Sequence, residues 1–474
     1  MVEEHREREL KFDVPEGWRL PAPDGLLPPG GTVEHDQLHL ETTYFDTADH
    51  DLLGSGVTLR RRTGDADTGW HLKVPDGDAR LEIRRPLEGR EDEPPDELVA
   101  LTLGLRAGAP LAPVATLTTQ RAVHRLVDAS GRPLAEVVVD DVHGTAMGEA
   151  AVITRWREVE VELADAGDED LLARAAEHLR TAGADRAASA SKLARALARP
   201  APATPPSGLA GLVACYLDAQ YRSLVFADVA LRRGREDVHR TRTATRRYRT
   251  ALRVFAPILD GSAAAHLDGE LKWYAELLGR VRDPQVLRQH LDAAVAELPP
   301  ELVLGPVRTR IHQLLATDLA EGRDALGQAM AGERYFALLR ELRAWHERLP
   351  TAGERPAAEA ARFLRKAKRT LRRRLAAAEN AAAPDQARHR ARKAAKRLRY
   401  AAELVRPELG GPAKRTGRRA KQVQRELGAR QDSVIAAEFL LRAARVAGTT
   451  PGENGFTFGL LYQREREAAG SRPS

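Results

Sequence analysis

The strongest constraint on the fold is a change of hydrophobic period partway along the chain. Up to about residue 199, apolar and polar residues alternate in short segments separated by turns, which is typical of antiparallel strands. From about residue 208, apolar residues recur at helical spacing, and Ala, Leu, Arg and Glu dominate. The Pro- and Ala-rich stretch ARPAPATPPSG lies between the two regions and indicates a linker. We therefore expect a multidomain α+β protein.

The first region contains eight segments with a strand pattern. Most are joined by short connections, which predicts an antiparallel sheet or barrel. Helical patterns follow at about 168–182 and 189–198. The strand segments are 5–12, 37–45, 57–62, 69–74, 80–87, 114–127, 134–142 and 151–163.

The charge of the chain is split between the two regions. The net charge of the 474 residues is +6, but residues 1–200 hold 24 Lys and Arg against 38 Asp and Glu, a net charge of −14. Residues 201–474 hold 50 against 30, a net charge of +20. We expect the basic region to attract a polyanion; the alternative is a surface tuned only for solubility.

Composition and motifs exclude several classes of protein. The single cysteine, Cys215, excludes an internal disulfide framework and a zinc cluster built from cysteines alone. No uncharged apolar run is long enough to span a bilayer, and the N-terminus has no apolar signal core. The chain also lacks GxxxxGK[ST] and HExxH motifs. We expect a cytoplasmic protein with no membrane partner.

Charged residues alternate along the predicted strands. Glu7, Glu9 and Lys11 share one face of the first strand, and the last strand repeats this with three glutamates, while other strands carry Lys and Arg. These faces could simply be solvated. If the sheet instead closes with its charged face inward, the lumen holds both signs, and buried charges must be paired or bind ions. A wet tunnel that binds a strong anion together with a hard cation such as Mg²⁺ satisfies both requirements.

The segment ERELK (7–11) resembles the ExExK signature of the CYTH domain, or triphosphate tunnel metalloenzyme, family. The resemblance continues in order over residues 1–199, through YFDT (44–47), LRRR (59–62), HLKV (71–74), RLE (80–82), Arg121, AEVVVD (135–140), EVEVE (158–162) and SASK (189–192). It implies a tunnel of eight antiparallel strands that binds a triphosphate with Mg²⁺ or Mn²⁺. Relatives hydrolyse inorganic triphosphate, nucleoside or thiamine triphosphates or RNA 5′ ends, and a few are adenylyl cyclases.

The resemblance also implies roles for individual residues. One departure is His124, which stands where many relatives place a second cation, although Arg125 follows it. The implied metal ligands are Glu7, Glu9, Glu160 and Glu162. The implied phosphate contacts are Lys11, Arg60, Arg62, Lys73, Arg80, Arg121 and Lys192. Glu158 and Asp140 are candidates for catalysis, through a second metal or the attacking water, and the division of roles among the last-strand glutamates stays open.

The second region contains an internal repeat. VHRTRTATRRYRTAL (238–252) is similar to RHRARKAAKRLRYAA (388–402) at an offset of 150, and LLGRVRD (277–283) is similar to ELGARQD (426–432) at an offset of 149. Two similar segments in the same order predict duplication of a helical unit. Each copy places its cations on one helical stripe. A solvated face is the alternative, but such a face normally mixes signs, so we expect anion binding. The stripes contain His239, Arg242, Arg246, Arg249, Arg253, His389, Arg392, Lys396 and Arg399, and Arg369 belongs to a further basic turn.

The repeated segments resemble the CHAD family, the conserved histidine α-helical domain. This resemblance implies two four-helix units that bind inorganic polyphosphate. We expect Asp283 and Asp432 to cap or to pair with nearby arginines rather than bind metal. The predicted organisation is a CYTH domain (1–199), a linker (200–207), a CHAD domain (208–445, with repeats at about 208–340 and 355–445) and a C-terminal tail (446–474), which is partly disordered or docks through GFTFGLLY.

The two resemblances predict a hydrolase. We expect metal-dependent hydrolysis of inorganic triphosphate or short polyphosphate, with polyphosphate bound by the basic helices. Two alternatives stay open: a polyphosphate-binding scaffold without catalysis, and a nucleotide-acting enzyme such as an adenylyl cyclase or a nucleoside or RNA triphosphatase. Few aromatic residues interleave with the cations, so we do not expect nucleic acid as a partner.

Overall fold

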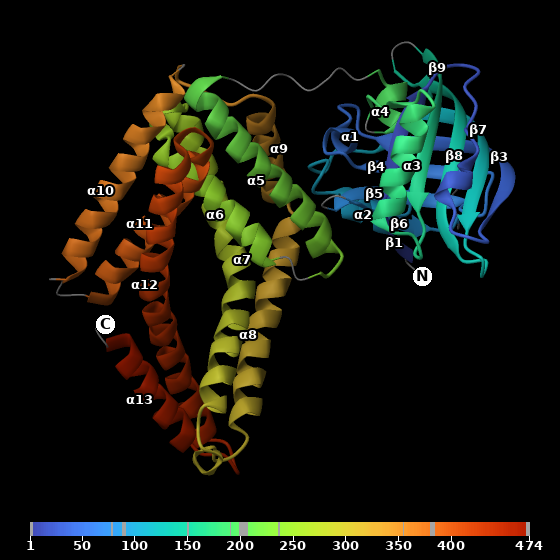
Figure 1. Cartoon of the computed structure of the whole chain (residues 1–474). Coiled ribbons are helices and arrows are strands. Elements are labelled where there is room, and N and C mark those ends of the chain that lie inside the picture. Colours follow the sequence, from blue (N-terminus) through green and yellow to red (C-terminus); the bar gives the residue numbers. More distant parts are fainter. Residues whose placement is uncertain are drawn as a thin grey trace. The chain divides into compact units, whose positions relative to one another are not determined.

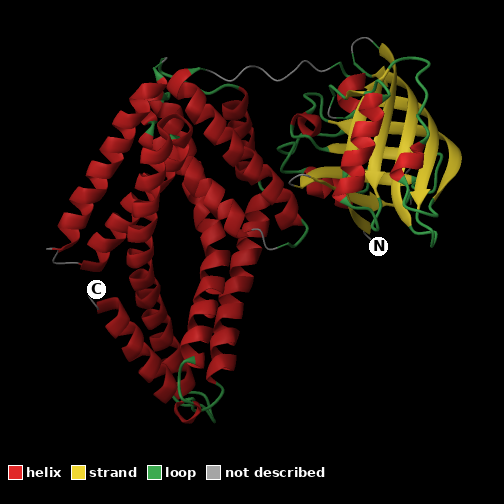
Figure 2. Ribbon diagram, viewed as in Figure 1, coloured by secondary structure: helices red, strands yellow, loops and turns green. Residues whose placement is uncertain are grey.

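The computed structural model describes residues 3–76, 79–87, 92–148, 151–189, 191–198, 207–235, 238–353, 355–379 and 384–470. Its contacts divide the chain into two compact units, Met1–Pro202 and Ala203–Ser474. The first is built around a β-sheet and the second is helical (Figures 1 and 2). The expected α+β class is therefore confirmed. None of the described helices combines the length and apolarity needed to cross a membrane.

The first unit contains one antiparallel sheet. Its strand order is β1-β6-β5-β4-β3-β7-β8-β9-β2-β10. Each of the eight expected strands has a counterpart among the described residues; the first is divided into β1 and β2, and the two-residue β10 is additional. The strands are β1 (Glu3–Glu7), β2 (Glu9–Val14), β3 (Thr32–Asp46), β4 (Thr58–Thr63), β5 (Gly69–Asp76), β6 (Ala79–Arg85), β7 (Ala112–Val127), β8 (Pro133–Ala146), β9 (Val152–Leu163) and β10 (Asp185–Arg186).

The N-terminal segment connects the two ends of this sheet. β1 pairs with β6 in the register Glu7↔Arg80, whereas β2 pairs with β9 in the register Glu9↔Glu162. Arg8 alone separates β1 from β2. The sheet is therefore not closed by hydrogen bonds into the expected barrel, and β1 and β10 are its edge strands. The two ends of the sheet are instead joined covalently, through Arg8.

Apolar residues of the outward strand face pack beneath a helix. α3 (Glu169–Thr181) contributes Leu171 and Ala175 to a buried core with Phe12, Val159 and Val161. Because side chains alternate along a strand, the neighbouring Lys11 and Glu160 point to the opposite, inner face. The charged faces therefore lie inside, as the alternation predicts. The remaining short elements of this unit are η1 (Pro23–Leu26), α1 (Asp51–Gly54), α2 (Asp96–Thr102) and α4 (Lys192–Ala196).

The second unit consists of helices in two repeats. The first repeat contains α5 (Gly208–Arg232), α6 (Val238–Val254), α7 (Gly261–Ala296), α8 (Val307–Met330) and α9 (Glu333–Glu347). The second contains α10 (Ala360–Glu379), α11 (Pro384–Leu404), α12 (Arg406–Gly448) and α13 (Phe456–Gly470). Short 3₁₀ turns join some of them: η2 (Ala256–Ile258), η3 (Pro300–Leu302) and η4 (Ala357–Glu359). The offsets of 150 and 149 residues make α6 equivalent to α11, and α7 equivalent to α12.

The end of the chain packs against both repeats. Phe458 and Leu461 of α13 are 2% and 1% exposed, in a core formed with the C-terminal halves of α7 and α12 and with α8. The apolar GFTFGLLY segment supplies these side chains. Of the two expectations for the tail, docking is correct and disorder is wrong for residues 456–470, while 471–474 lie outside the described residues.

Candidate functional site

The inner face of the sheet encloses a charged cavity of about 270 Å³. Its walls come from the strands β2 to β9 and from the start of α4. All of the expected phosphate contacts line it: Lys11, Arg60, Arg62, Lys73, Arg80, Arg121 and Lys192. Of the expected metal ligands, Glu9, Glu160 and Glu162 also line it, and the side chain of Glu7 lies outside the described part of the structure.

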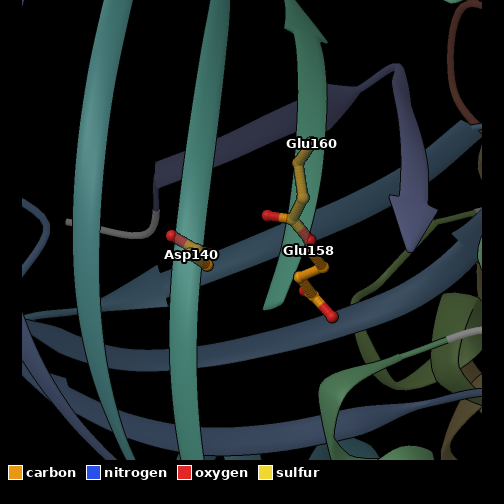
Figure 3. A group of neighbouring side chains, drawn as sticks. All are labelled: Asp140, Glu158 and Glu160. Atoms are coloured by element: carbon orange, nitrogen blue, oxygen red, sulfur yellow. The ribbon is translucent and has the colours of Figure 1, made fainter. Parts of the chain in front are cut away.

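Three buried carboxylates form a cluster beside the cavity. Asp140 of β8 lies opposite Glu158 of β9 in the strand register, and Glu160 follows on the same face (Figure 3). One oxygen from each lies within 4.8 Å of the others. The Lys192 Nζ atom already lies among them, 3.0 Å from Asp140, 2.5 Å from Glu158 and 2.9 Å from Glu160. An ammonium group thus neutralises the place where three carboxylates converge.

The position of Lys192 depends on α4. Ser191 caps this short helix, because its side-chain oxygen accepts a hydrogen bond from the backbone nitrogen of Ala194 at 3.2 Å. Leu193 and Ala196 anchor the helix in a buried apolar core. Burial lowers the pKa of Lys192, but Glu158, Glu160 and Asp140 outweigh it and raise the pKa well above its ordinary value. Lys192 is therefore a fixed cation.

Arg121 adds a second fixed cation beside the cluster. Its Nε and Nη2 atoms donate to the two oxygens of Asp140 at 2.8 and 2.7 Å, and Nη2 lies 3.3 Å from Glu160. Burial raises the pKa of Asp140, but Lys192 and Arg121 outweigh it, so the pKa is lowered and the carboxylate stays ionised. Asp140 and Glu158 are 0% and 4% exposed. They lie behind Lys192 and Arg121 and are not part of the cavity wall.

Glu9, Lys11 and Glu160 form a second charged group, which lines the cavity. The Lys11 ammonium lies 3.2 Å from Glu9 and also contacts Glu160. Burial raises the pKa of Glu9 and of Glu160, but the nearby cations, Lys11 first among them, lower the pKa of both carboxyl groups. Glu9 faces Glu162 across the strand pair. Ionised carboxylate oxygens grouped in this way are the ligands that Mg²⁺ and Mn²⁺ prefer, so these residues fit a divalent cation.

Glu82 is a buried counter-ion of the site that was not among the residues predicted from the sequence. It is 0% exposed, and its carboxylate lies 3.4 Å from Lys73, 3.7 Å from Arg60 and 2.5 Å from Arg84. The His71 ring nitrogen lies 2.9 Å away. Burial raises the pKa of Glu82, but the hydrogen bond from His71 and the cations lower it far below its usual range. The alternation Arg80–Glu82–Arg84 was the available signal, because it places all three side chains inside.

One end of the sheet interior is filled by apolar side chains. Tyr44, Leu117, Trp156, Leu193 and Ala196 form a buried core between strands β3, β7 and β9 and helix α4. Trp156 Nε1 donates to Glu158 at 2.6 Å, so the indole joins this core to the carboxylate cluster. The charged part of the interior therefore ends at Trp156.

The departure at His124 does not remove a cavity cation. Arg125 lines the cavity and pairs with Glu136 at 3.0 Å. His124 points to the other face of β7, where its ring packs edge-on against His35 at 4.8 Å. The strand alternation explains both placements.

In the helical unit, α6 and α11 bring the two basic stripes together. Arg246 of α6 contacts Tyr400 of α11, and Arg247 lies 2.8 Å from Glu403. Lys396 is therefore surrounded by Arg392 of its own helix and by Arg242 and Arg246 of α6. Burial and these three cations lower the pKa of Lys396 to about 7. The repulsion shows that positive charge is concentrated where α6 and α11 meet.

Acidic residues hold other arginines of the stripes in equivalent positions. Arg242 pairs with Asp283 in the first repeat, and Arg392 lies 3.6 Å from Asp432 in the second, which are the pairs expected from the LGxxxD segments. Arg249 and Arg253 share Asp268 at 3.0 and 2.6 Å. Arg399 donates to Gln424, and His389 lies 3.3 Å from Gln431. His239 is exposed on α6, and Arg369 is exposed on a different helix, α10.

An antiparallel sheet around a cavity that holds both cations and carboxylates defines a triphosphate tunnel fold, here joined to a duplicated helical unit. Family models agree with this: the CYTH domain matches residues 5–197 and the CHAD domain matches residues 215–441. The uncharacterized protein Rv2226 of Mycobacterium tuberculosis is 37% identical over 490 residues, covering 98% of this chain and 94% of that protein.

Solved structures also match single units. PptA from Streptomyces chartreusis covers 56% of this chain and 95% of its own, with 21% identity and a TM-score of 0.47. The CHAD domain from the plant Ricinus communis covers 58% of this chain and 96% of its own, with 22% identity and a TM-score of 0.43. The chain belongs to the family of proteins that join a CYTH domain to a CHAD domain. CYTH proteins are enzymes that act on triphosphate substrates with divalent metal ions.

Proposed function

We propose that this protein hydrolyses inorganic triphosphate or short polyphosphate in its tunnel and binds polyphosphate on the basic helices. The observation that carries the proposal is the cavity itself, where nine Lys and Arg side chains from several strands and α4 line the same space as Glu9, Glu160 and Glu162. Phosphoryl transfer requires positioning and neutralisation of charge, and little covalent chemistry from the protein. The lining is almost entirely polar, with Tyr44 as its aromatic member, which favours a substrate without a base.

The residues have three roles in this proposal. Glu9, Glu160 and Glu162, with Glu7, would hold a divalent cation, which would neutralise phosphate charge and lower the pKa of a bound water. The phosphate oxygens are bound by Lys11, Arg60, Arg62, Lys73, Arg80, Arg121 and Lys192, with arginine providing bidentate contacts. Asp140 and Glu158 act as positioning residues, because they fix the guanidinium of Arg121 and the ammonium of Lys192 that face the substrate.

The test is release of phosphate from tripolyphosphate by the purified full chain. We expect hydrolysis with Mg²⁺, none with a chelator, and a loss of about 100-fold or more in Glu9→Gln, because removing one charge-stabilising group commonly costs this much. Glu41→Gln is the matched control, since Glu41 is an exposed strand residue, and it should keep full activity. Release of phosphate that is insensitive to chelator, or equal in both variants, contradicts the proposal.

Two other functions remain to be separated from this one. A nucleotide-acting enzyme would prefer ATP or RNA 5′-triphosphate over tripolyphosphate in the same assay, and a cyclase would release pyrophosphate. A scaffold without catalysis would bind polyphosphate and release no phosphate from any of these substrates. The ionised carboxylates at Glu9 and Glu160 support an enzyme, because a simple polyanion binder gains nothing from burying them.

A further inference from the structure

The two helical repeats differ in one element. In the first repeat, α9 packs against α5, α7 and α8. Among the described residues, no helix takes the equivalent place in the second repeat, where a groove of about 320 Å³ lies between α10, α11 and α12. We call it the α10–α12 groove.

In the first repeat, α9 contacts α7 through three pairs of residues. Arg334 of α9 donates to Glu270 at 2.8 Å, Glu341 lies 3.6 Å from His266, and the rings of Tyr335 and Tyr274 are 5.2 Å apart. The offset of 149 residues carries His266, Glu270 and Tyr274 onto three positions of α12. These are Arg415, Arg419 and Val423, and all three line the groove.

The residues of α5 that contact α9 also have equivalents in the groove. His346 of α9 lies 2.7 Å from Asp218 and stacks on Tyr221 with ring centres 4.8 Å apart. An offset of 150 residues carries Asp218 and Tyr221 onto Lys368 and Leu371 of α10, and both line the groove. The groove is thus the surface that α9 covers in the first repeat, left uncovered by the described helices of the second.

The groove differs in charge from the surface that α9 covers in the first repeat. Its floor is apolar, with Leu371, Leu398 and Ala420 at 6%, 3% and 1% exposed. Its lining, all within the described helices, contains no carboxylate and four cations, Lys368, Arg372, Arg415 and Arg419. Lys368 stands where the first repeat has Asp218, and Arg419 stands where it has Glu270. A helix that fits this groove must therefore carry acids where α9 carries His346 and Arg334.

We propose that the α10–α12 groove binds an acidic amphipathic helix of a partner protein, which completes the second bundle as α9 completes the first. An apolar floor between charged walls is the recognition surface for such a helix. The groove is as wide as one helix, because the equivalent surface of the first repeat holds one helix, α9. The proposal is independent of the tunnel chemistry and of polyphosphate binding.

The experiment uses two helix-stabilised, fluorescent peptides and the full-length chain. One peptide has the sequence of α9 (333–347). The other carries Arg334→Glu and His346→Glu, so that it presents acids to Arg419 and Lys368. Anisotropy titrations should show that the acidic peptide binds about tenfold more tightly than the native peptide, because two partly exposed ion pairs separate them.

A charge swap in the protein distinguishes specific docking from damage. Arg419→Glu recreates the Glu270 arrangement, so it should weaken the acidic peptide and strengthen the native one. Arg425→Glu changes an exposed residue of the same helix outside the groove and should alter neither affinity. The proposal is overturned if the two peptides bind equally well or if Arg419→Glu changes both affinities in the same direction. It is also overturned if phosphatidylglycerol vesicles bind through Arg415 and Arg419 while neither peptide does.

Discussion

At the scale of single residues, the tunnel is organised by charges that neutralise one another before any ligand arrives. Lys192 lies within 3.0 Å of Asp140, Glu158 and Glu160. Glu82 plays the converse role among Arg60, Lys73 and Arg84. The buried ions of these two clusters have partners of opposite sign, so the walls keep their charge although the side chains are largely removed from solvent.

Removing the Lys192 ammonium should therefore destabilise the first unit strongly. We expect Lys192→Gln to lower its free energy of unfolding by about 3–5 kcal/mol, because three buried carboxylates lose a shared cation. Calorimetry of the full chain measures the loss. Arg195→Gln, on the same helix, removes a half-exposed pair with Asp13 and should cost at most about 1 kcal/mol. Equal losses in both variants would contradict this account.

Lys396 should make polyphosphate binding depend on pH. Burial, Arg392, Arg246 and Arg242 lower its pKa to about 7, and Asp432 of α12 is the acid that faces it. A bound anion raises that pKa, so binding above pH 7 takes up a proton, and affinity should fall by up to about tenfold per pH unit between pH 7 and 9. Below pH 7 Lys396 is already charged. In Lys396→Arg, the affinity for polyphosphate measured by titration calorimetry should not change with pH over this range. If the affinity of this variant still falls with pH as in the unchanged protein, Lys396 is not the cause of the pH dependence.

At the scale of elements, the spacing of apolar and charged residues along the sequence determined which elements could be predicted. Alternation located every strand except the two-residue β10, because a sheet with one charged face and one apolar face repeats every two residues. It also placed the expected cations inside. It could not reveal that Glu82 is the counter-ion of three cations, or that α4 inserts Lys192 among carboxylates of β8 and β9. Both depend on contacts between segments far apart in the chain, which local periodicity does not encode.

Helix contacts of the second unit were beyond sequence reasoning for the same reason. The repeat offsets predicted equivalent helices, but not that α7 and α8 approach each other closely at one residue. A Cβ atom at Gly322 of α8 would lie 2.6 Å from the carbonyl oxygen of Arg280 on α7. The backbone of the partner helix therefore excludes any side chain there.

Two glycines of α8 should respond in opposite directions to the same substitution. Gly322→Ala forces the helices apart and should destabilise the second unit by about 1–3 kcal/mol. Gly327 is exposed, and a methyl group added there would have no neighbouring atom within 4 Å, so Gly327→Ala should stabilise the helix by up to about 1 kcal/mol. Thermal unfolding followed by circular dichroism compares the two. A stabilising Gly322→Ala would show that α7 and α8 are not in close contact.

At the scale of the whole molecule, a basic unit is tethered to a unit that we propose is catalytic. The polymer bound by the stripes would raise the concentration of chain ends near the tunnel. The tether matters only for substrates long enough to engage both units. Changes in the helical unit should therefore affect the hydrolysis of long substrates more than that of short ones.

Arg392→Glu should separate these two substrate classes. In the full chain we expect the KM for long-chain polyphosphate to rise by about tenfold or more, while the KM for tripolyphosphate changes by less than about twofold. Arg390→Glu, an exposed change on the same helix, is the control and should affect neither. Steady-state phosphate release gives both constants. A parallel rise for both substrates would mean that the two units do not cooperate in this way.

The division of the N-terminal segment at Arg8 has a consequence for synthesis of the protein. β2 leaves the ribosome before its partner β9, because Glu9 pairs with Glu162, which lies more than a hundred residues later in the chain. At about 5–20 residues per second, the first strand waits roughly 8–30 s for its neighbour. During that interval its alternating charges discourage pairing with other nascent chains, because charged edge strands resist association. Glu9 and Lys11, which line the cavity of the folded protein, would therefore also disfavour aggregation of the unfinished chain.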